Sequence, residues 1–247
     1  IDVGDGDDFV SLNSGSLIHG TILGGPGGDT LHLVGENLTN GWVENFEDTV
    51  KFGGGLSVID GNLETTELDV FDGRLSILQG LSGASNVIVG SGGFEAELGG
   101  LQNFISTSTE IGVSGILSAG ASSILDNPSL AVGTFSHTGD INFNAGATLR
   151  VDINGATGAA DLISQNGMVN IEPGAILQVG PVTVDAPIQD GIHLALHSVA
   201  APAVTTGNFS SVNFLLDENV VMTHESTSGF DVTNSGEFTS SAGCLVS

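Results

Sequence analysis

Four aspartates near the start of the chain are the residues whose type and spacing best fit a chemical role, the binding of a metal ion. The segment 24–32, Gly-Gly-Pro-Gly-Gly-Asp-Thr-Leu-His, fits the calcium-binding nonapeptide G-G-x-G-x-D-x-U-x, and the segment 3–11 fits it with one glycine missing. Carboxylates and turn carbonyls at this spacing can give Ca²⁺ the oxygen ligands that it prefers. The candidate ligands are Asp5, Asp7, Asp8 and Asp29.

A second interpretation gives the same aspartates a structural role. The two segments start 21 residues apart, whereas calcium-binding nonapeptides adjoin one another, so Asp8 and Asp29 could instead cap turns in stacked repeats. Stacked like charges repel each other, and this repulsion is the physical reason to retain calcium as a prediction. We expect no other cofactor.

The sequence gives little support for a catalytic role. The chain has no Gly-x-Ser-x-Gly, His-Glu-x-x-His or P-loop motif. His193 and His197 lie four positions apart on an expected strand, which separates them by about 13 Å, too far to bind one metal ion. A β-helical, glycan-active enzyme would use converging carboxylates. Four acidic residues are candidates for such carboxylates, but we interpret them as part of a solvated face: Asp69, Asp72, Glu95 and Glu97. We therefore predict no catalytic site, and the enzyme is the least favoured alternative.

Aromatic residues are few, and most are expected inside the fold. Trp42, beside Asn40-Gly41, is a candidate for an exposed ring that stacks on a ligand, but a core or ladder position is favoured. Four phenylalanines are predicted to form interior stacks: Phe46, Phe52, Phe71 and Phe104.

The elements that position these residues follow from the composition. The 247 residues include 29 acidic and 3 basic side chains, which give a formal charge of −26. This charge repels phosphate backbones and anionic lipids, so nucleic-acid binders and basic membrane-surface helices are excluded. With 38 glycines and 40% apolar residues, the chain is typical of a glycine-punctuated β protein. Its one cysteine, Cys244, rules out an intrachain disulfide.

An internal repeat predicts a solenoid. Apolar residues recur in two columns with steps of 18 to 21 residues. The first column is Leu17, Leu38, Leu56, Leu75, Phe94 and Val113, and the second is Val10, Leu31, Val50, Leu68, Val87 and Ile105. Apolar and polar residues alternate around these positions, which indicates short strands. The fold class is therefore all-β, a parallel β-helix with coils of about 19 residues stacked about 4.8 Å apart.

The repeat loosens after about residue 130. Strands are still expected at 147–153, 161–164, 168–171 and 175–179. Three prolines near the apolar run 192–199 then indicate hairpins or a cap in place of regular coils. We expect regular coils over 1–130, a less regular end with a cap over 131–232, and a flexible Ser/Gly-rich tail over 233–247.

Several segments resemble the passenger domains of bacterial autotransporters. The stretches 139–154 (Gly-Asp-Ile-Asn-Phe-Asn-Ala-Gly-Ala-Thr-Leu-Arg-Val-Asp-Ile-Asn), 161–163 and 170–179 are similar to the end of these passengers, just before their outer-membrane barrel. The motifs Val43-Glu-Asn-Phe46 and Leu101-Gln-Asn-Phe104, 58 residues apart, resemble their L-x-N-F coil motif. The run Gly28-Asp-Thr-Leu-His-Leu33 is similar to their coil starts.

This resemblance implies a right-handed parallel β-helix on the bacterial cell surface, attached to the outer membrane or released, whose C-terminal, autochaperone-like part helps to nucleate folding. The implied partners are a β-barrel translocator in the same precursor and a ligand on a host or neighbouring cell. The chain shows no series of barrel strands. The expected function is that of a structural stalk or adhesin segment. The alternative is a free secreted solenoid that self-associates through its terminal coils into filaments.

Overall fold

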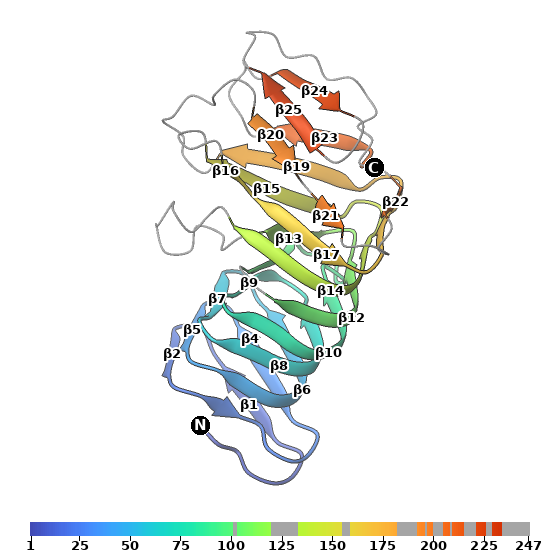
Figure 1. The fold of residues 1–247 in the computed structure, drawn as a ribbon. Coiled ribbons are helices and arrows are strands. Elements are labelled where there is room, and N and C mark those ends of the chain that lie inside the picture. The colour runs from blue at the N-terminus through green and yellow to red at the C-terminus, as the bar shows by residue number, and fades with distance from the viewer. Residues whose placement is uncertain are drawn as a thin grey trace.

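The computed structural model describes residues 1–100, 103–119, 133–154, 159–181, 192–195, 197–199, 205–207, 209–214, 221–225 and 229–233. Within these ranges the protein is all-β, and its strands are arranged in three sheets. Along the main path of each large sheet the strands are parallel and follow one another from the N-terminal end of the stack in chain order (Figure 1). The short strand β16 is the exception, because it pairs antiparallel with β15. The predicted fold class is confirmed at this level.

The first sheet has twelve strands and the second has ten. The first sheet contains β1 (Phe9–Leu12), β3 (Ile22–Leu23), β4 (Thr30–Val34), β6 (Val43–Phe52), β8 (Asn62–Val70), β10 (Gly80–Val89), β12 (Phe104–Ile111), β14 (Thr134–Phe143), β17 (Leu162–Asn166), β18 (Val169–Ile171), β21 (His197–Val199) and β22 (Thr205–Gly207). The second sheet contains β2 (Ser16–His19), β5 (Asn37–Asn40), β7 (Leu56–Ile59), β9 (Gly73–Ile77), β11 (Ala96–Gly100), β13 (Gly115–Ala119), β15 (Thr148–Asn154), β16 (Ala159–Ala160), β19 (Ile176–Pro181) and β23 (Ser211–Phe214).

The chain alternates between these two sheets, so each coil adds one layer to both. Paired residues lie 18 to 23 positions apart in the sequence from β1 through β13. The separation rises to between 28 and 36 positions from the β12–β14 and β13–β15 pairings onward. The loosening of the repeat near residue 130 therefore marks a change in the length of chain between paired strands.

A third sheet has a different pairing. Strands β20 (Ile192–Ala195), β25 (Gly229–Thr233) and β24 (Val221–Glu225) pair antiparallel. The apolar run 192–199, expected to be one element, is split: β20 belongs to this sheet and β21 belongs to the first sheet. Of the expected tail, Thr233 ends β25, and 234–247 lie outside the described residues.

Aliphatic side chains from the facing sides of both large sheets fill the interior. In many strands buried and more exposed residues alternate, as in β4, where Leu31 and Leu33 are buried between partly exposed neighbours, whereas all five residues of β11 are buried. One contiguous cluster of buried apolar residues runs from Leu12 to Phe209. Burial of these side chains at about 25 cal/mol per Å² drives the stacking of coils.

The predicted columns drift out of register in places. Leu98, not Phe94, pairs with Leu75, because the glycine-rich loop before β11 lengthens that coil, and Phe94 is 58% exposed. Thr49, not Val50, pairs with Leu31. Further members of the predicted columns are exposed as well: Leu17, Ile105 and Val113. A shift of one residue moves a side chain to the opposite face of a strand, so a period alone does not fix the register.

The Asn-Phe pairs of the two L-x-N-F motifs have the same local structure, whereas Leu101 and Gln102 lie outside the described residues. Asn45 and Asn103 have φ angles of 58° and 37°, and the following Phe46 and Phe104 are buried. Both phenylalanines adjoin a register shift in the first sheet. Asparagine tolerates the left-handed conformation better than most residues, so it can turn the chain immediately before an inward ring.

Candidate functional site

The four predicted calcium ligands lie on two turns that stack directly on each other. Gly25 and Gly27 lie so close to the main chain of Gly4 and Gly6 that a β-carbon at either position would overlap a carbonyl oxygen. The Gly6 amide donates to the Pro26 carbonyl at 2.9 Å. The glycine spacing of the nonapeptide thus allows one turn to lie against the next.

The structure brings two of these aspartates together. The Asp8 amide donates to Asp29 Oδ1 at 2.9 Å, and the Asp29 amide donates to Glu47 Oε2 at 2.7 Å. Asp7 Oδ1 accepts the Gly28 amide at 2.9 Å, and Asp5 is exposed. The structural interpretation expected Asp8 and Asp29 to cap turns; capping of a main-chain amide in the neighbouring turn is observed for Asp29 and for Asp7, whereas Asp8 Oδ2 has no partner.

The same turns hold unsatisfied oxygens. Asp29 is fully buried, and its Oδ2 has no hydrogen-bond partner in the structure; the same holds for the buried Oδ2 of Asp8. No group of three or more His, Cys, Asp and Glu side chains that could hold a metal ion occurs among the residues that the structure describes. The calcium prediction therefore depends on carboxylates acting together with main-chain oxygens.

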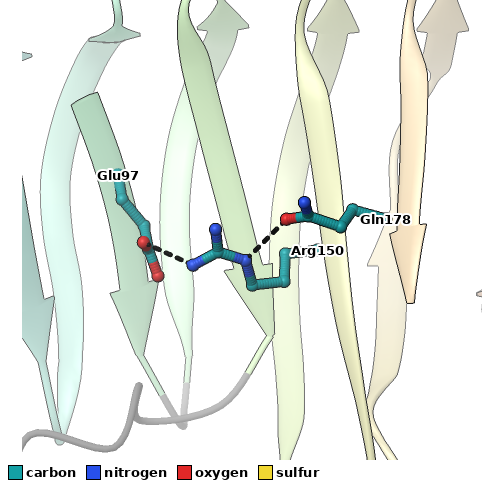
Figure 2. A network of polar contacts seen from close by, with 3 residues as sticks. All are labelled: Glu97, Arg150 and Gln178. Atoms are coloured by element: carbon teal, nitrogen blue, oxygen red, sulfur yellow. Dashed lines mark hydrogen bonds and ion pairs between the residues drawn. The ribbon is translucent and has the colours of Figure 1, made fainter. Parts of the chain in front are cut away.

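A second polar arrangement joins side chains from three strands of the second sheet, β11, β15 and β19 (Figure 2). Arg150 Nη1 lies 2.8 Å from Glu97 Oε2, and Arg150 Nε donates to Gln178 Oε1 at 2.9 Å. The Glu97 side chain is only 3% exposed and that of Arg150 is 23% exposed. Because β13 lies between β11 and β15, this contact ties together coils that are two layers apart.

Two further carboxylates lie close to Arg150 along the chain. Burial raises the pKa of Asp152 to about 6, although the Arg150 charge opposes the shift. Burial also raises the pKa of Asp161 to about 8, against the effect of its hydrogen bonds. Asp161 Oδ1 accepts the Gly133 amide at 2.7 Å, and Oδ2 accepts the Asp152 amide at 2.8 Å. Asp161 thus joins the starts of β14 and β17 to β15.

Polar side chains also occur inside the core. Ser106 Oγ and Thr109 Oγ1 lie 3.1 Å and 3.0 Å from His137 Nε2, and all three residues are buried. Burial lowers the pKa of His137 to about 4. A serine beside a histidine could suggest nucleophilic catalysis, but this pair is enclosed, so a substrate has no access to it.

The Lys51 ammonium group binds main-chain carbonyl oxygens at a turn. The Lys51 side chain is fully buried, and Nζ donates to the carbonyls of Gly53 at 2.6 Å and of Phe52 and Asp72 at 3.3 Å. Burial lowers its pKa. Two of the three basic side chains, Lys51 and Arg150, are thus used to bind internal oxygens.

Several sequence interpretations need correction. Glu97 was expected on a solvated face but is buried, because Arg150 balances its charge; Asp69 and Asp72 are partly exposed, and Glu95 is exposed as expected.

The aromatic and histidine predictions also need correction. Trp42 was expected inside but is 50% exposed, and Phe71 is 38% exposed, because both lie at corners between the sheets. Phe52 is half-buried. His193 and His197 lie in different sheets, not on one strand.

One feature of the sequence could have indicated the Glu97–Arg150–Gln178 contacts. In a chain with only three basic residues, each one is a candidate for a specific carboxylate or carbonyl partner. Nothing in the spacing identified Glu97 as the partner of Arg150, because the two are 53 residues apart.

Comparisons with known proteins returned no match, either among protein-family models or among curated sequences. Within the described ranges, no helix has the length and apolar character needed to cross a bilayer. The described residues define the class at the level of the fold: an all-β protein of parallel strands in stacked sheets.

Proposed function

We propose that this chain is the stalk and folding-nucleating part of a bacterial autotransporter passenger, located outside the cell, with a structural or adhesive role and no catalytic site. In this proposal the fold is a right-handed β-helix with coils of about 19 residues over its first half. Right-handed crossovers are strongly favoured between parallel strands of one sheet, which supports this handedness.

The observation that carries the proposal is the unbroken pairing of both large sheets. In the first sheet the path runs from β1 to β21, and in the second it runs from β2 to β23. Each coil contacts its neighbours, so coils can add one after another as the chain emerges, and burial of each new layer supplies free energy. A stack of this kind can hold a binding region away from a membrane.

The L-x-N-F motif gives independent support. The Asn-Phe pairs of its two copies lie on β6 and at the start of β12, three pairing steps apart, and in both the asparagine has a positive φ and the phenylalanine is buried. The motif shared with the resembled family therefore has a structural reason to recur in a stack of coils.

Features at the coil-length change support a nucleating role for the C-terminal part. The Glu97–Arg150–Gln178 contacts and Asp161 all lie where the pairing separation increases. The Glu97–Arg150 contact joins a longer coil to one of the last short ones, and the contacts of Asp161 and Gln178 join the longer coils to each other. The antiparallel strands β20, β24 and β25 are proposed to cap the stack, which blocks pairing of exposed edges.

An immunoblot of fractions from the producing organism tests this function. Antibody against this chain should detect a band far larger than 24.9 kDa in the outer membrane, because the barrel translocator belongs to the same precursor. A band near 24.9 kDa, found in the medium and sedimenting in a concentration-dependent way, would overturn the proposal in favour of a free, filament-forming solenoid.

A further inference from the structure

The carboxylate of Asp29 lacks a counter-charge. Its side chain is fully buried, Oδ1 is occupied by the Asp8 amide, and Oδ2 has no partner. An ionised carboxylate in such a place costs several kcal/mol unless a positive group balances it. The one ion pair among the described residues joins Arg150 and Glu97, and Lys51 Nζ donates to main-chain carbonyls. Within the described ranges, no cationic side chain therefore pairs with Asp29.

Stacking adds further negative charge at this point. Phe9 pairs with Thr30, and Thr30 pairs with Asp48, so the residues before them occupy one position in three successive coils. These residues are Asp8, Asp29 and Glu47. Neighbouring parallel strands are about 4.8 Å apart, so the three carboxylates repel one another. Asp8 also has a buried, unpartnered Oδ2.

A second oxygen lies close to the Asp29 carboxylate. Gly24 has no side chain, and a β-carbon built there would lie 3.0 Å from Asp29 Oδ2 and would overlap the Asn45 carbonyl oxygen. The Asn45 carbonyl oxygen and Asp29 Oδ2 therefore both lie against Gly24, where no side chain separates them. Asn45 has a φ of 58°, and this conformation orients its peptide group at the turn.

We propose that Asp29, Asp8 and the Asn45 carbonyl oxygen bind a calcium ion between the first stacked turns, with water completing its coordination. Calcium takes six to eight oxygen ligands at about 2.3 to 2.6 Å in flexible geometry, which suits a mixed set of carboxylate, carbonyl and water. Its double charge balances two carboxylates. Magnesium demands a nearly ideal octahedron and gives up its water reluctantly, so this site favours calcium. The inference is independent of the proposed stalk function.

Thermal melting and titration calorimetry of the full chain test this site. After treatment with EDTA, addition of calcium to about ten times its dissociation constant should raise the melting temperature by about 3 to 6 °C. Asp29→Asn should lose this shift and the calorimetric heat, yet melt no lower than the wild type in EDTA, since it removes a repelling charge. Asp60→Asn, at an exposed turn in another coil, is the matched control and should keep the full shift.

Two outcomes overturn the proposal. Absence of calorimetric heat and of a melting shift in the wild type at neutral pH would mean that no calcium binds between the turns. An equal shift with magnesium, or in both variants, would reduce the effect to general charge screening. If Asp29→Asn does not fold, Asp8→Asn is used in its place, because Asp8 is partly exposed and its substitution disturbs the core less. This variant should lose the calcium response in the same way.

Discussion

Arg150 reaches over an intervening strand to Glu97: its Nη1 lies 2.8 Å from Glu97 Oε2 although β13 separates β15 from β11. Strand pairing connects only neighbouring coils. This contact connects coils two layers apart, at the point where the separation of paired residues increases from 19 positions in β11–β13 to 32 in β13–β15. It therefore couples the two halves of the stack through side chains.

Removal of the arginine should destabilise the protein more than removal of both charges. Arg150→Met leaves Glu97 buried and unpaired, which we expect to cost about 3 kcal/mol of unfolding free energy, the low end for a buried pair because Arg150 is 23% exposed. The double variant Glu97→Gln/Arg150→Met should recover at least half of this loss. Urea denaturation of the three proteins measures both values. A single variant as stable as the wild type would show that the ion pair contributes nothing.

Asp161 should make the protein less stable as the pH rises. Its folded pKa of about 8 lies above the ordinary value of 3.8, so the folded state holds the proton more tightly than the unfolded chain. The resulting stabilisation is fully present below pH 3.8 and is lost as the pH rises through about 8.

Melting curves of the wild type and Asp161→Asn between pH 4 and pH 8.5 measure this effect. Asp152, with a pKa of about 6, contributes to the same loss up to that pH in both proteins. The difference should therefore be clearest between pH 6 and pH 8, where the wild type should lose stability more steeply than the variant. Parallel curves over this interval would refute the assignment.

His137 should make the protein less stable as the pH falls. Burial lowers its folded pKa from 6.5 to about 4, so its stabilisation is present above pH 6.5 and is lost as the pH falls through about 4. The imidazole signal of His137 in NMR should titrate near pH 4. His137→Gln should flatten the acid side of the stability profile, whereas the exposed-site control His19→Gln should leave it unchanged. Titration of His137 near pH 6.5 would contradict its burial among Ser106 and Thr109.

Asn45 should tolerate glycine but not a branched side chain. Its φ of 58° costs most L residues about 1 to 2 kcal/mol, and glycine pays no such steric penalty. Asn45→Val should therefore lower the unfolding free energy by at least about that amount, while Asn45→Gly stays close to the wild type. The same pair of substitutions at Asn103 should behave alike. Equal stability of the valine and glycine variants would show that the backbone conformation is not the reason for the asparagine.

The period and strand type were readable from the sequence because alternation and turn residues are local. Leu17–Leu38 and Val10–Leu31 pair as the columns predicted. Register was lost at Phe94, since the extra residues of a glycine-rich loop are not visible to a count of apolar positions. The predicted strands at 147–153 and 175–179 agree with β15 and β19 within two residues.

The polar contacts were much less accessible to prediction. Asp8 and Asp29 could be connected because one nearly regular coil separates them, and the amide of one does donate to the carboxylate of the other. Burial of Glu97 depends on a partner 53 residues away, and burial of Lys51 depends on carbonyl groups that only the folded turn brings together. Such residues are identified by their environment, which a single sequence does not contain.

Spin-label distances along one column test most directly that the coils stack in parallel and in order. Thr30, Asp48, Glu67, Asn86, Ser108 and Asp140 form this column in successive strands of the first sheet. With Cys244 replaced by serine, labels on Thr30 paired with Asn86, Ser108 or Asp140 should be separated by about 14, 19 and 24 Å before the label length is added. An increase of about 5 Å at each step is the predicted result. Distances that do not grow with the number of intervening strands would contradict the stacked fold and, with it, the proposed stalk.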